Sequence, residues 1–455
     1  MNRQVLDDTE SRFAAYVQAL TSVIGYPARS EPLKDYCVGL LAAEGRKSVE
    51  PMAALTAPAT VSAQHQKLLH FVANAGWSDA RVLFKVQELA VPAMERHGPI
   101  EVWIIDDTSF PKKGSHSVGV HHQYCGELGK QANCQVVVTL SIANHDAGLP
   151  IAYRLYLPQA WAENAERRKQ AHIPEDITFK SKPRIALEQL QAACAAGVPA
   201  GVALMDPAYG TDSSLRSGIR KLERSYVAGV WSSIKVRSAA RRGDPGPRMS
   251  VKEIARSLPH HAWRTIKWRE GTNDQLRSRF ARVRVHASPT RGRRGQPEET
   301  LLIEWPEGEA EPTHYWLSNL DKNISFLRLV DLAKMRWRIE RDYQDLKQEI
   351  GLGHYEGLGM AWFSSPRQSV HRSLWLPDLR TGDDSPPQDL VPAGESKNLS
   401  FPIVTDPAAP PIRPERHIPS SLATLHRRLV MAIAKTLPRC PCCARTFRRS
   451  SRRVV

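Results

Sequence analysis

Two adjacent carboxylates directly follow an apolar segment in the stretch "VWIIDDTSFPKKG". A second apolar run, "GVALMDPAYG", ends in Asp206 and is stopped by a proline. Side chains alternate along a strand, so Asp106 and Asp107 are expected to point to opposite faces unless the strand has ended. When two strands of one sheet each end in an aspartate, their carboxylates can meet at the sheet rim, where α/β sites usually lie. Such neighbours repel, and a divalent cation between them relieves the repulsion. Taken alone, each aspartate is also explained as a turn former or a helix N-cap.

A third acidic candidate, Glu340, lies in the helical pattern "AKMRWRIERDYQDLKQEIGLGHYEG". Polar residues at positions i, i+4, i+7 and i+11 share one face of a helix, and here they are Arg336, Glu340, Tyr343 and Lys347. The neighbouring apolar stripe consists of Ile339, Leu346 and Ile350. In isolation, a solvated face of paired charges explains the arginine, the glutamate and the lysine without any catalytic role.

The elements that must position these residues form an α/β pattern. Residues 1–98 read as helices, because apolar residues recur at helical spacing. From Glu101 onward, "EVWIID", "CQVVVTLSIAN", "LPIAYRLYLP" and "GVALMD" are short, apolar and rich in β-formers, and the helix "KPRIALEQLQAACAAG" ends at Gly197 before the last of them. This order predicts a mixed sheet. Further strands such as "FARVRVHA" and "TLLIEWPEG" precede one long helix from about Ser325 to Glu349.

The charge of the chain indicates a polyanionic partner. Its 455 residues carry a formal charge of +16, and nucleic acid is the first candidate for such a surplus. The alternative is a compositional bias toward arginine without function. No apolar run approaches the roughly 18–20 residues that cross a bilayer, and the N-terminus has no apolar signal core. We therefore expect no membrane association and a cytoplasmic location.

The cysteines do not form a recognisable framework. Seven is an odd count, which favours a reducing compartment. The histidines and cysteines of "HSVGVHHQYCGELGKQANC" are zinc-ligand types, but their spacing lacks paired ligands at both ends, which argues against a zinc site. The tail "LPRCPCCART" offers half of a metal site with no visible second half.

Together, the motifs "IDDTSFPKKG", "GVALMDPAYG" and "RWRIERDYQDLK" resemble the DDE transposases of bacterial insertion sequences, whose core is RNase H-like. The resemblance covers about residues 20–357 and the tail from about Arg413. The helix motif is similar to that group's Tyr-Arg-Glu-Lys signature: Arg336, Glu340 and Lys347 fit, whereas Ala333 stands at the Tyr position. The group places its first aspartate directly before a threonine, which favours Asp107 over Asp106.

The resemblance implies a metal-dependent enzyme that cuts and joins DNA strands. Asp107, Asp206 and Glu340 would hold two Mg²⁺ or Mn²⁺ ions roughly 4 Å apart, because an all-oxygen ligand set suits these ions and not Zn²⁺. DNA phosphates would be bound by Arg336, Lys347, Lys112 and Lys113. Its partners would be double-stranded DNA with terminal inverted repeats, target DNA and a second copy of the chain in the active complex. Such a protein would be associated with the bacterial nucleoid.

The expected fold class is α/β: an RNase H-like mixed-sheet core with an N-terminal helical domain and a β-rich insertion between the second aspartate and the glutamate. The expected division is a helical, DNA-binding domain at 1–98, the first part of the core at 99–226, the insertion at 227–318, the glutamate-bearing helix at 319–357, a disordered or frameshifted segment at 358–418, and a C-terminal helix with a basic, Cys-containing tail at 419–455. The insertion loop "TRGRRG", with Lys267, Trp268 and Arg269, could meet DNA backbone and a splayed base. The alternative for Trp268 is packing within a sheet.

The segment from Met360 onward departs from the rest of the chain, since it is rich in proline and serine and has no sustained period. A codon-compatible reading in another frame would supply the apolar helix that related transposases have there. The hypothesis is a frameshift near residue 358, which would make this chain a degenerate copy. Two competing functions remain open: a catalytically inactive DNA-binding remnant, and a general RNase H-like nuclease.

Overall fold

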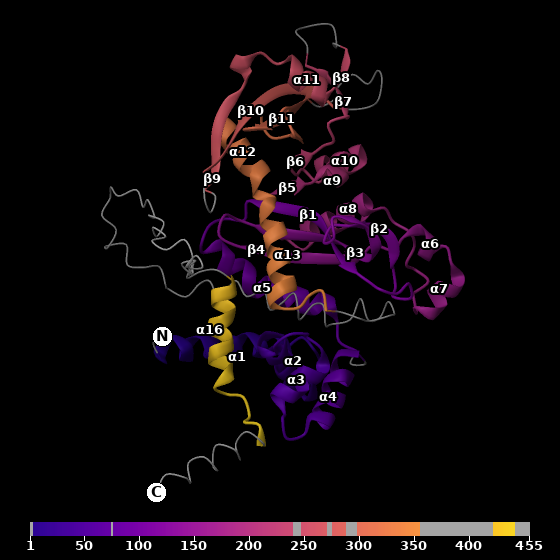
Figure 1. Ribbon diagram of the computed structural model, residues 1–455, viewed down its shortest axis with the longest axis vertical. Coiled ribbons are helices and arrows are strands. Elements are labelled where there is room, and N and C mark those ends of the chain that lie inside the picture. Colours follow the sequence, from indigo (N-terminus) through magenta and orange to yellow (C-terminus); the bar gives the residue numbers. More distant parts are fainter. Residues whose placement is uncertain are drawn as a thin grey trace, which may run out of the picture. The chain divides into compact units, whose positions relative to one another are not determined.

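The computed structural model describes residues 3–73, 76–239, 247–270, 275–287, 298–354 and 422–441 (Figure 1). Its contacts divide the chain into two compact units. One unit comprises residues up to Phe71 together with the C-terminal helix α16, and the other begins at Val72 and contains the sheet. The division does not coincide with the boundary expected near residue 98, because α5 (Asp79–Glu95) belongs to the sheet-containing unit.

The first unit is helical, as its sequence pattern indicates. Its elements are α1 (Arg3–Thr21), η1 (Pro27–Arg29), α2 (Ser30–Ala42), α3 (Val49–Thr56), α4 (Val61–Ala73) and α16 (Leu422–Ala434). Apolar side chains from α1 to α4 are fully buried, including Leu20, Leu33, Leu40, Met52 and Leu68. The imidazole Nε2 of His426 lies 2.9 Å from the carbonyl oxygen of Leu41, which ties α16 to α2.

The second unit is built on one mixed sheet. Its first strands are β1 (Val102–Pro111), β2 (His121–Cys125), β3 (Lys130–Ala143), β4 (Gly148–Leu155), β5 (Val202–Met205) and β6 (Tyr226–Gly229). Strand β3 pairs antiparallel with β1, β2 and β4, whereas β5 runs parallel to both β1 and β6. The mixed α/β sheet expected for an RNase H-like core is therefore confirmed.

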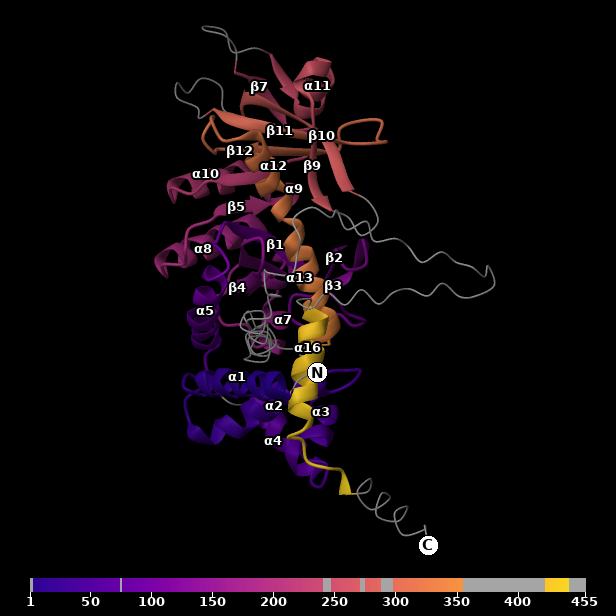
Figure 2. The same ribbon diagram turned by 90° about the vertical axis from the view of Figure 1, so that its left-hand side faces the viewer.

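Helices cover the two faces of this sheet. Figure 2 shows α8 (Lys182–Ala195) on one side of β1 and α13 (Trp337–Glu349) on the other. The side-chain amide of Gln189 on α8 donates to the carbonyl of Val138 on β3 at 3.0 Å, which fixes this helix against the sheet. Gly197 has a φ of +70°, so the expected glycine stop of α8 is confirmed. Two small helices, α6 (Gln159–Ala162) and α7 (Ala165–Gln170), precede it.

The insertion extends the same sheet instead of forming a separate one. From β6 the strand order continues through β12, β11, β10, β7 and β8, with β9 paired to β10. Between β5 and β6 lie two helices, α9 (Pro207–Gly210) and α10 (Ser213–Lys221). The elements of the insertion after β6 are β7 (Lys235–Ser238), β8 (Arg248–Ser250), α11 (Val251–Ser257), η2 (His260–Ala262), β9 (Arg264–Glu270), β10 (Gln275–His286), β11 (Glu299–Pro306) and β12 (His314–Ser318). The loop "TRGRRG" and the side chains of Trp268 and Arg269 lie outside the described residues, as does the segment 355–421.

The helix that carries Glu340 is not continuous. It consists of α12 (Phe326–Met335) and α13, which meet at Arg336. The expectation of one helix from Ser325 to Glu349 is wrong at this residue, where the Arg336 N–H bonds to the carbonyl of Lys334 instead of one four residues back. The apolar stripe of α13 is buried as expected. Among the described helices, none is long and apolar enough to cross a bilayer.

Candidate active site

Asp106 and Asp206 are brought together by strand register. Strands β1 and β5 are parallel, and their last paired residues are Ile105 and Met205. Asp106 and Asp206 each follow directly, so they lie at equivalent positions beyond the paired region. The turn after Asp206 is tight: Gly210 of α9 packs against the backbone of Gly229 on β6, where a β-carbon would collide with the carbonyl oxygen.

Asp206 is also a helix N-cap, which is the simple interpretation of its sequence. Its Oδ1 accepts a hydrogen bond of 3.1 Å from the N–H of Tyr209. This bond and the close packing of α9 hold the carboxylate at the end of β5. The role of Asp206 as an N-cap does not exclude a role as a metal ligand, because the Tyr209 N–H uses only Oδ1 of the carboxylate.

Arg336 links Asp106 to the third acidic residue. Its Nη1 lies 2.8 Å from Oδ2 of Asp106, and its Nη2 bonds to Oε1 of Glu340 one helical turn further along. The other oxygen of Asp106 accepts the N–H of Asp107 at 2.8 Å. The family motif favours Asp107 as the ligand, whereas in the structure it is Asp106 that shares Arg336 with Glu340. The physical reason is that α13 covers the face of β1 to which Asp106 points, whereas α8 covers the face of Asp107.

The electrostatics of this group show an excess of negative charge. Burial, together with the neighbouring Asp206 and Asp107 carboxylates, raises the pKa of Asp106 to about 7 against the lowering effect of Arg336. Burial likewise raises the pKa of Asp206, and Asp107 adds to the effect. Burial would lower the pKa of Arg336, but Asp106, Glu340 and Asp206 outweigh it and raise that pKa. One guanidinium thus does not compensate the carboxylates fully.

Asp107 has different partners. Its Oδ2 lies 2.8 Å from Nζ of Lys182, the first residue of α8, and accepts a longer bond of 3.4 Å from the hydroxyl of Tyr209. Burial and then the Asp107 charge raise the pKa of that tyrosine well above its ordinary value. Since Asp107 also acts on the pKa of Asp206, it belongs to the same charged region but faces α8. Among the described residues, Asp107 makes no hydrogen bond or ion pair with Glu340.

The four expected phosphate ligands fall into two places. Arg336 and Lys347 lie along β1: Nζ of Lys347 is 3.0 Å from the carbonyl of Ser109 and 2.6 Å from Oε2 of Glu127. Lys112 and Lys113 follow the end of β1, where Lys112 is half-buried and Lys113 is exposed. In the structure, the two cations of α13 are thus paired with carboxylates of the chain itself.

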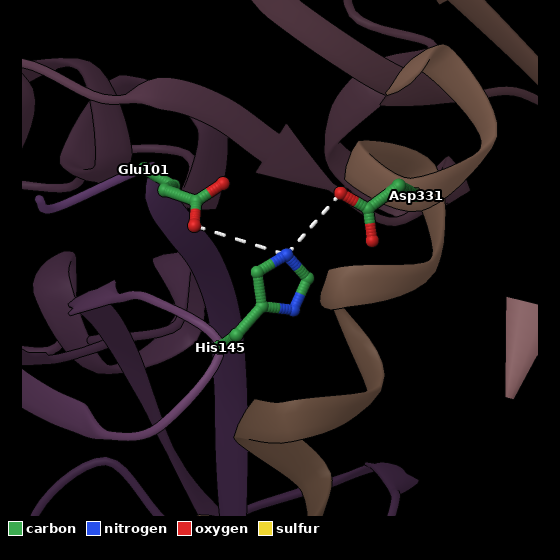
Figure 3. Close-up of side chains that lie close together, drawn as sticks. All are labelled: Glu101, His145 and Asp331. Carbon is green, nitrogen blue, oxygen red and sulfur yellow. Dashed lines mark hydrogen bonds and ion pairs between the residues drawn. The ribbon is translucent and has the colours of Figure 1, made fainter. Parts of the chain in front are cut away.

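A separate cluster of Glu101, His145 and Asp331 lies near the site, and its possible ligand atoms lie within 4.8 Å of one another. Figure 3 shows Nε2 of His145, in the turn after β3, between carboxylates of Glu101 and Asp331, at 3.7 and 3.2 Å. It is the one such group found in the described part of the chain. However, Arg328 pairs with both carboxylates, and Arg338 donates to the carbonyl of His145. The cluster therefore anchors α12 and α13 on either side of Arg336.

The cysteine segments considered for zinc give no such group within the described ranges. Cys125 is buried and its Sγ donates to Oγ of Ser109 at 3.4 Å, and Cys134 is buried beside it. Cys442 and Cys443 of the tail lie outside the described residues.

Comparison with known proteins identifies the class that this fold and site define. The family model for the DDE superfamily endonuclease matches residues 19–275, more than half of the chain, which therefore belongs to this family of endonucleases. The chain is also 28% identical over 145 residues to the probable transposase for insertion sequence element IS701 of Microchaete diplosiphon. That match covers 32% of this chain and about a third, 35%, of the relative. The predicted resemblance to DDE-type transposases is thereby confirmed.

The family match includes both candidate aspartate positions but ends before Glu340. The glutamate is supported by its helix motif and by its contact with Arg336. Two residues near the site were missed from the sequence, namely Lys182 and Tyr209. A signal existed for each, since Lys182 begins a helix directly beside a core strand and Tyr209 lies three residues after Asp206.

Proposed function

We propose that this chain is a transposase that cuts and joins DNA at the ends of an insertion sequence in a metal-dependent reaction. The observation that carries the proposal is the shared Arg336 guanidinium, which links Asp106 to Glu340 beside the in-register Asp206. The proposed metal ligands are Asp206, Glu340 and, in place of Asp107 favoured by the family motif, Asp106.

The residues suit a divalent cation. All the candidate ligand atoms are carboxylate oxygens, which favour Mg²⁺ or Mn²⁺. The pKa values of Asp106 and Asp206 are raised first by burial and then by neighbouring carboxylates, and a bound cation would favour the charged form of both groups. When bound, two such ions supply activation of water or a DNA 3′-hydroxyl and stabilisation of the leaving oxygen.

The side chains of the protein have their own roles in this proposal. The register of β1 and β5 and the N-cap bond of Asp206 hold two carboxylates in fixed positions. Glu340 is the most exposed of the three, with 62% of its side chain accessible, so it can close over DNA that has entered. Arg336 would leave its carboxylates and bind a phosphate beside the scissile bond, since guanidinium matches phosphate as well as carboxylate.

The proposed substrate is double-stranded DNA carrying terminal inverted repeats, with target DNA as the second partner. The formal charge of +16 supports a polyanionic substrate. The similarity to the probable IS701 transposase supports an insertion sequence as the source of this DNA. We further propose that the active complex contains two copies of the chain and works at the bacterial nucleoid.

The test uses duplexes that end in the element's own terminal sequence and duplexes with that sequence scrambled. Mg²⁺-dependent cutting at the element end is expected, together with its loss in Glu340→Gln and its retention in Glu166→Gln, an exposed glutamate on α7. Binding without cutting would favour the inactive remnant. Equal cutting of scrambled duplexes or of RNA–DNA hybrids would favour a general nuclease. A version with the reading frame restored across residues 358–390 is assayed in parallel.

A further inference from the structure

The β2–β3 hairpin reaches back onto the strand that carries Asp106. Its turn is closed by a 3.0 Å bond from the N–H of Leu128 to the carbonyl of Cys125. The N–H of Glu127 donates to Oγ of Ser109 at 3.2 Å, and Sγ of Cys125 donates to the same oxygen. Ser109 lies three residues beyond Asp106 on β1. The hairpin turn is therefore fixed next to the candidate active site.

Lys347 connects this turn to α13. Its Nζ bonds to Oε2 of Glu127 at 2.6 Å and to the carbonyl of Ser109 at 3.0 Å, and lies 5.5 Å from the ring centroid of Phe110. On α13, Lys347 follows Glu340 by two helical turns, so both side chains lie on the face toward β1. The ammonium group thus lies beside β1, two helical turns along α13 from Glu340.

The hairpin exposes basic and aromatic side chains. Its exposed side chains on β2 and at the start of β3 include His121, His122, Tyr124 and Lys130, and Lys113 is exposed just before it. The side chain of Tyr124 is 60% accessible, so its ring is open to a nucleotide base. The sequence from Lys112 to Lys130 contains a single acidic residue, Glu127, and its carboxylate forms an ion pair with Lys347.

We propose that the β2–β3 hairpin is part of the DNA-binding surface and that Glu127 occupies the phosphate site of Lys347 until DNA replaces it. The inference rests on the proposed function, because it assumes that DNA reaches the carboxylates along α13. A DNA phosphodiester carries one negative charge, as a carboxylate does, and its oxygens accept from an ammonium group with comparable geometry, so the many phosphates of a DNA strand can compete with Glu127 for Lys347. Glu127 is 39% accessible, so exchange of partners at Lys347 needs no unfolding of the core. The turn stays anchored by its backbone bond and its bonds to Ser109, so the exchange frees only the Glu127 side chain.

The experiment measures DNA affinity for four forms of the full chain: unchanged, Glu127→Gln, Lys347→Met and the double variant. Glu127→Gln is expected to tighten binding by about two- to fivefold, since exposed ion pairs are of that strength. Lys347→Met is expected to weaken binding, and more so in the Glu127→Gln background, because Lys347 then no longer has to leave a carboxylate. The matched control is Glu311→Gln, which removes an equally accessible glutamate (39%) that pairs with Lys252 in the insertion.

Hydrogen exchange provides a second measurement that does not depend on variants. Backbone amides of the turn, including Glu127 and Leu128, should exchange more slowly when DNA is added, because the hairpin is proposed to lie against it. If none of the four forms binds DNA, the proposed function fails. If the unchanged chain binds DNA but Glu127→Gln binds equally or more weakly, or the turn gains no protection, Glu127 is a structural anchor and this inference is wrong.

Discussion

Asp106 and Glu340 are held by the same guanidinium, although they lie at opposite ends of the catalytic part of the sequence. If a divalent cation binds these carboxylates as proposed, it would compete with Arg336, which is their counter-charge in the structure.

Replacing Arg336 should strengthen metal binding in the absence of DNA. Arg336→Gln removes one positive charge within a few ångströms of the carboxylates, and an increase of Mn²⁺ affinity by about tenfold is expected from Coulomb energies of this size. Calorimetric titration with Mn²⁺ measures it. Arg328→Gln is the control, since Arg328 pairs with Glu101 and Asp331 of the flanking cluster. Unchanged or weaker Mn²⁺ binding in Arg336→Gln would show that the guanidinium does not compete.

The two adjacent aspartates should behave differently. Asp106→Asn is expected to abolish Mg²⁺-dependent cutting while DNA binding persists, because metal ligands are not the main source of phosphate affinity. Asp107→Asn removes the partner of Lys182 and should reduce cutting less. Cutting and binding are measured side by side for both variants, with Asp206→Asn as the reference for complete loss. The reverse order of severity would restore Asp107 as the ligand.

The stability of the protein without divalent ions should depend on pH through Asp106. Burial raises its pKa to about 7 from 3.8, so the folded protein holds this proton more tightly than the unfolded chain. As the pH rises from about 4 to about 7, the free energy of unfolding therefore falls, by on the order of 4 kcal/mol in total. Asp106→Asn has no carboxyl group to ionise at this position, so it does not lose stability in this way as the pH rises. Its Tm in EDTA should therefore exceed that of the unchanged protein at pH 8 and approach it at pH 5, whereas a constant difference would argue against a raised pKa.

Two consecutive glutamates of the insertion should differ in their effect on stability. Glu299 is buried and accepts bonds from Tyr226 and Arg220, with the buried Arg216 at 3.9 Å, whereas Glu298 is 41% accessible and pairs with Arg284. Glu299→Gln leaves a buried cation without its counter-charge and should cost about 2–4 kcal/mol. Glu298→Gln should cost less than about 1 kcal/mol. Thermal unfolding of the two variants makes the comparison, and equal effects would mean that the buried network is dispensable.

DNA binding should weaken steeply with salt. Each phosphate neutralised by lysine or arginine contributes roughly −0.9 to the slope of log affinity against log salt. The surplus of basic residues predicts a slope of several units, measured by fluorescence anisotropy between low and moderate ionic strength. A slope near zero would assign the charge to another purpose.

Local features of the fold could be predicted because they depend on neighbouring residues. The stop of α8 at Gly197 and the buried stripe of α13, including Ile339 and Leu346, follow from side-chain periodicity and glycine conformation. The strand pattern also predicts that the side chains of Asp106 and Asp107 point to opposite faces of the sheet. These inferences need no knowledge of which elements meet in space.

The rest depends on contacts between distant segments. Which aspartate faces α13 is decided by the placement of two helices on opposite faces of β1, and no short stretch of sequence encodes that placement. The pairing of Asp107 with Lys182 and the docking of Glu127 on Lys347 join residues far apart in the chain. The break at Arg336 has no proline or glycine beside it that would predict it from the sequence. It lies between two contacts of distant residues, namely Glu101 with α12 and His145 with α13.

The continuity of the sheet from β6 into β12 has a consequence for any attempt to shorten this protein. Without the insertion, β6 would be an edge strand with a row of open backbone donors and acceptors, which is a template for pairing with other chains. Strand β12 covers that edge through the pairs from Val227 to Gly229. A core trimmed of residues between β6 and α12 should therefore aggregate, even though every candidate catalytic carboxylate remains in it.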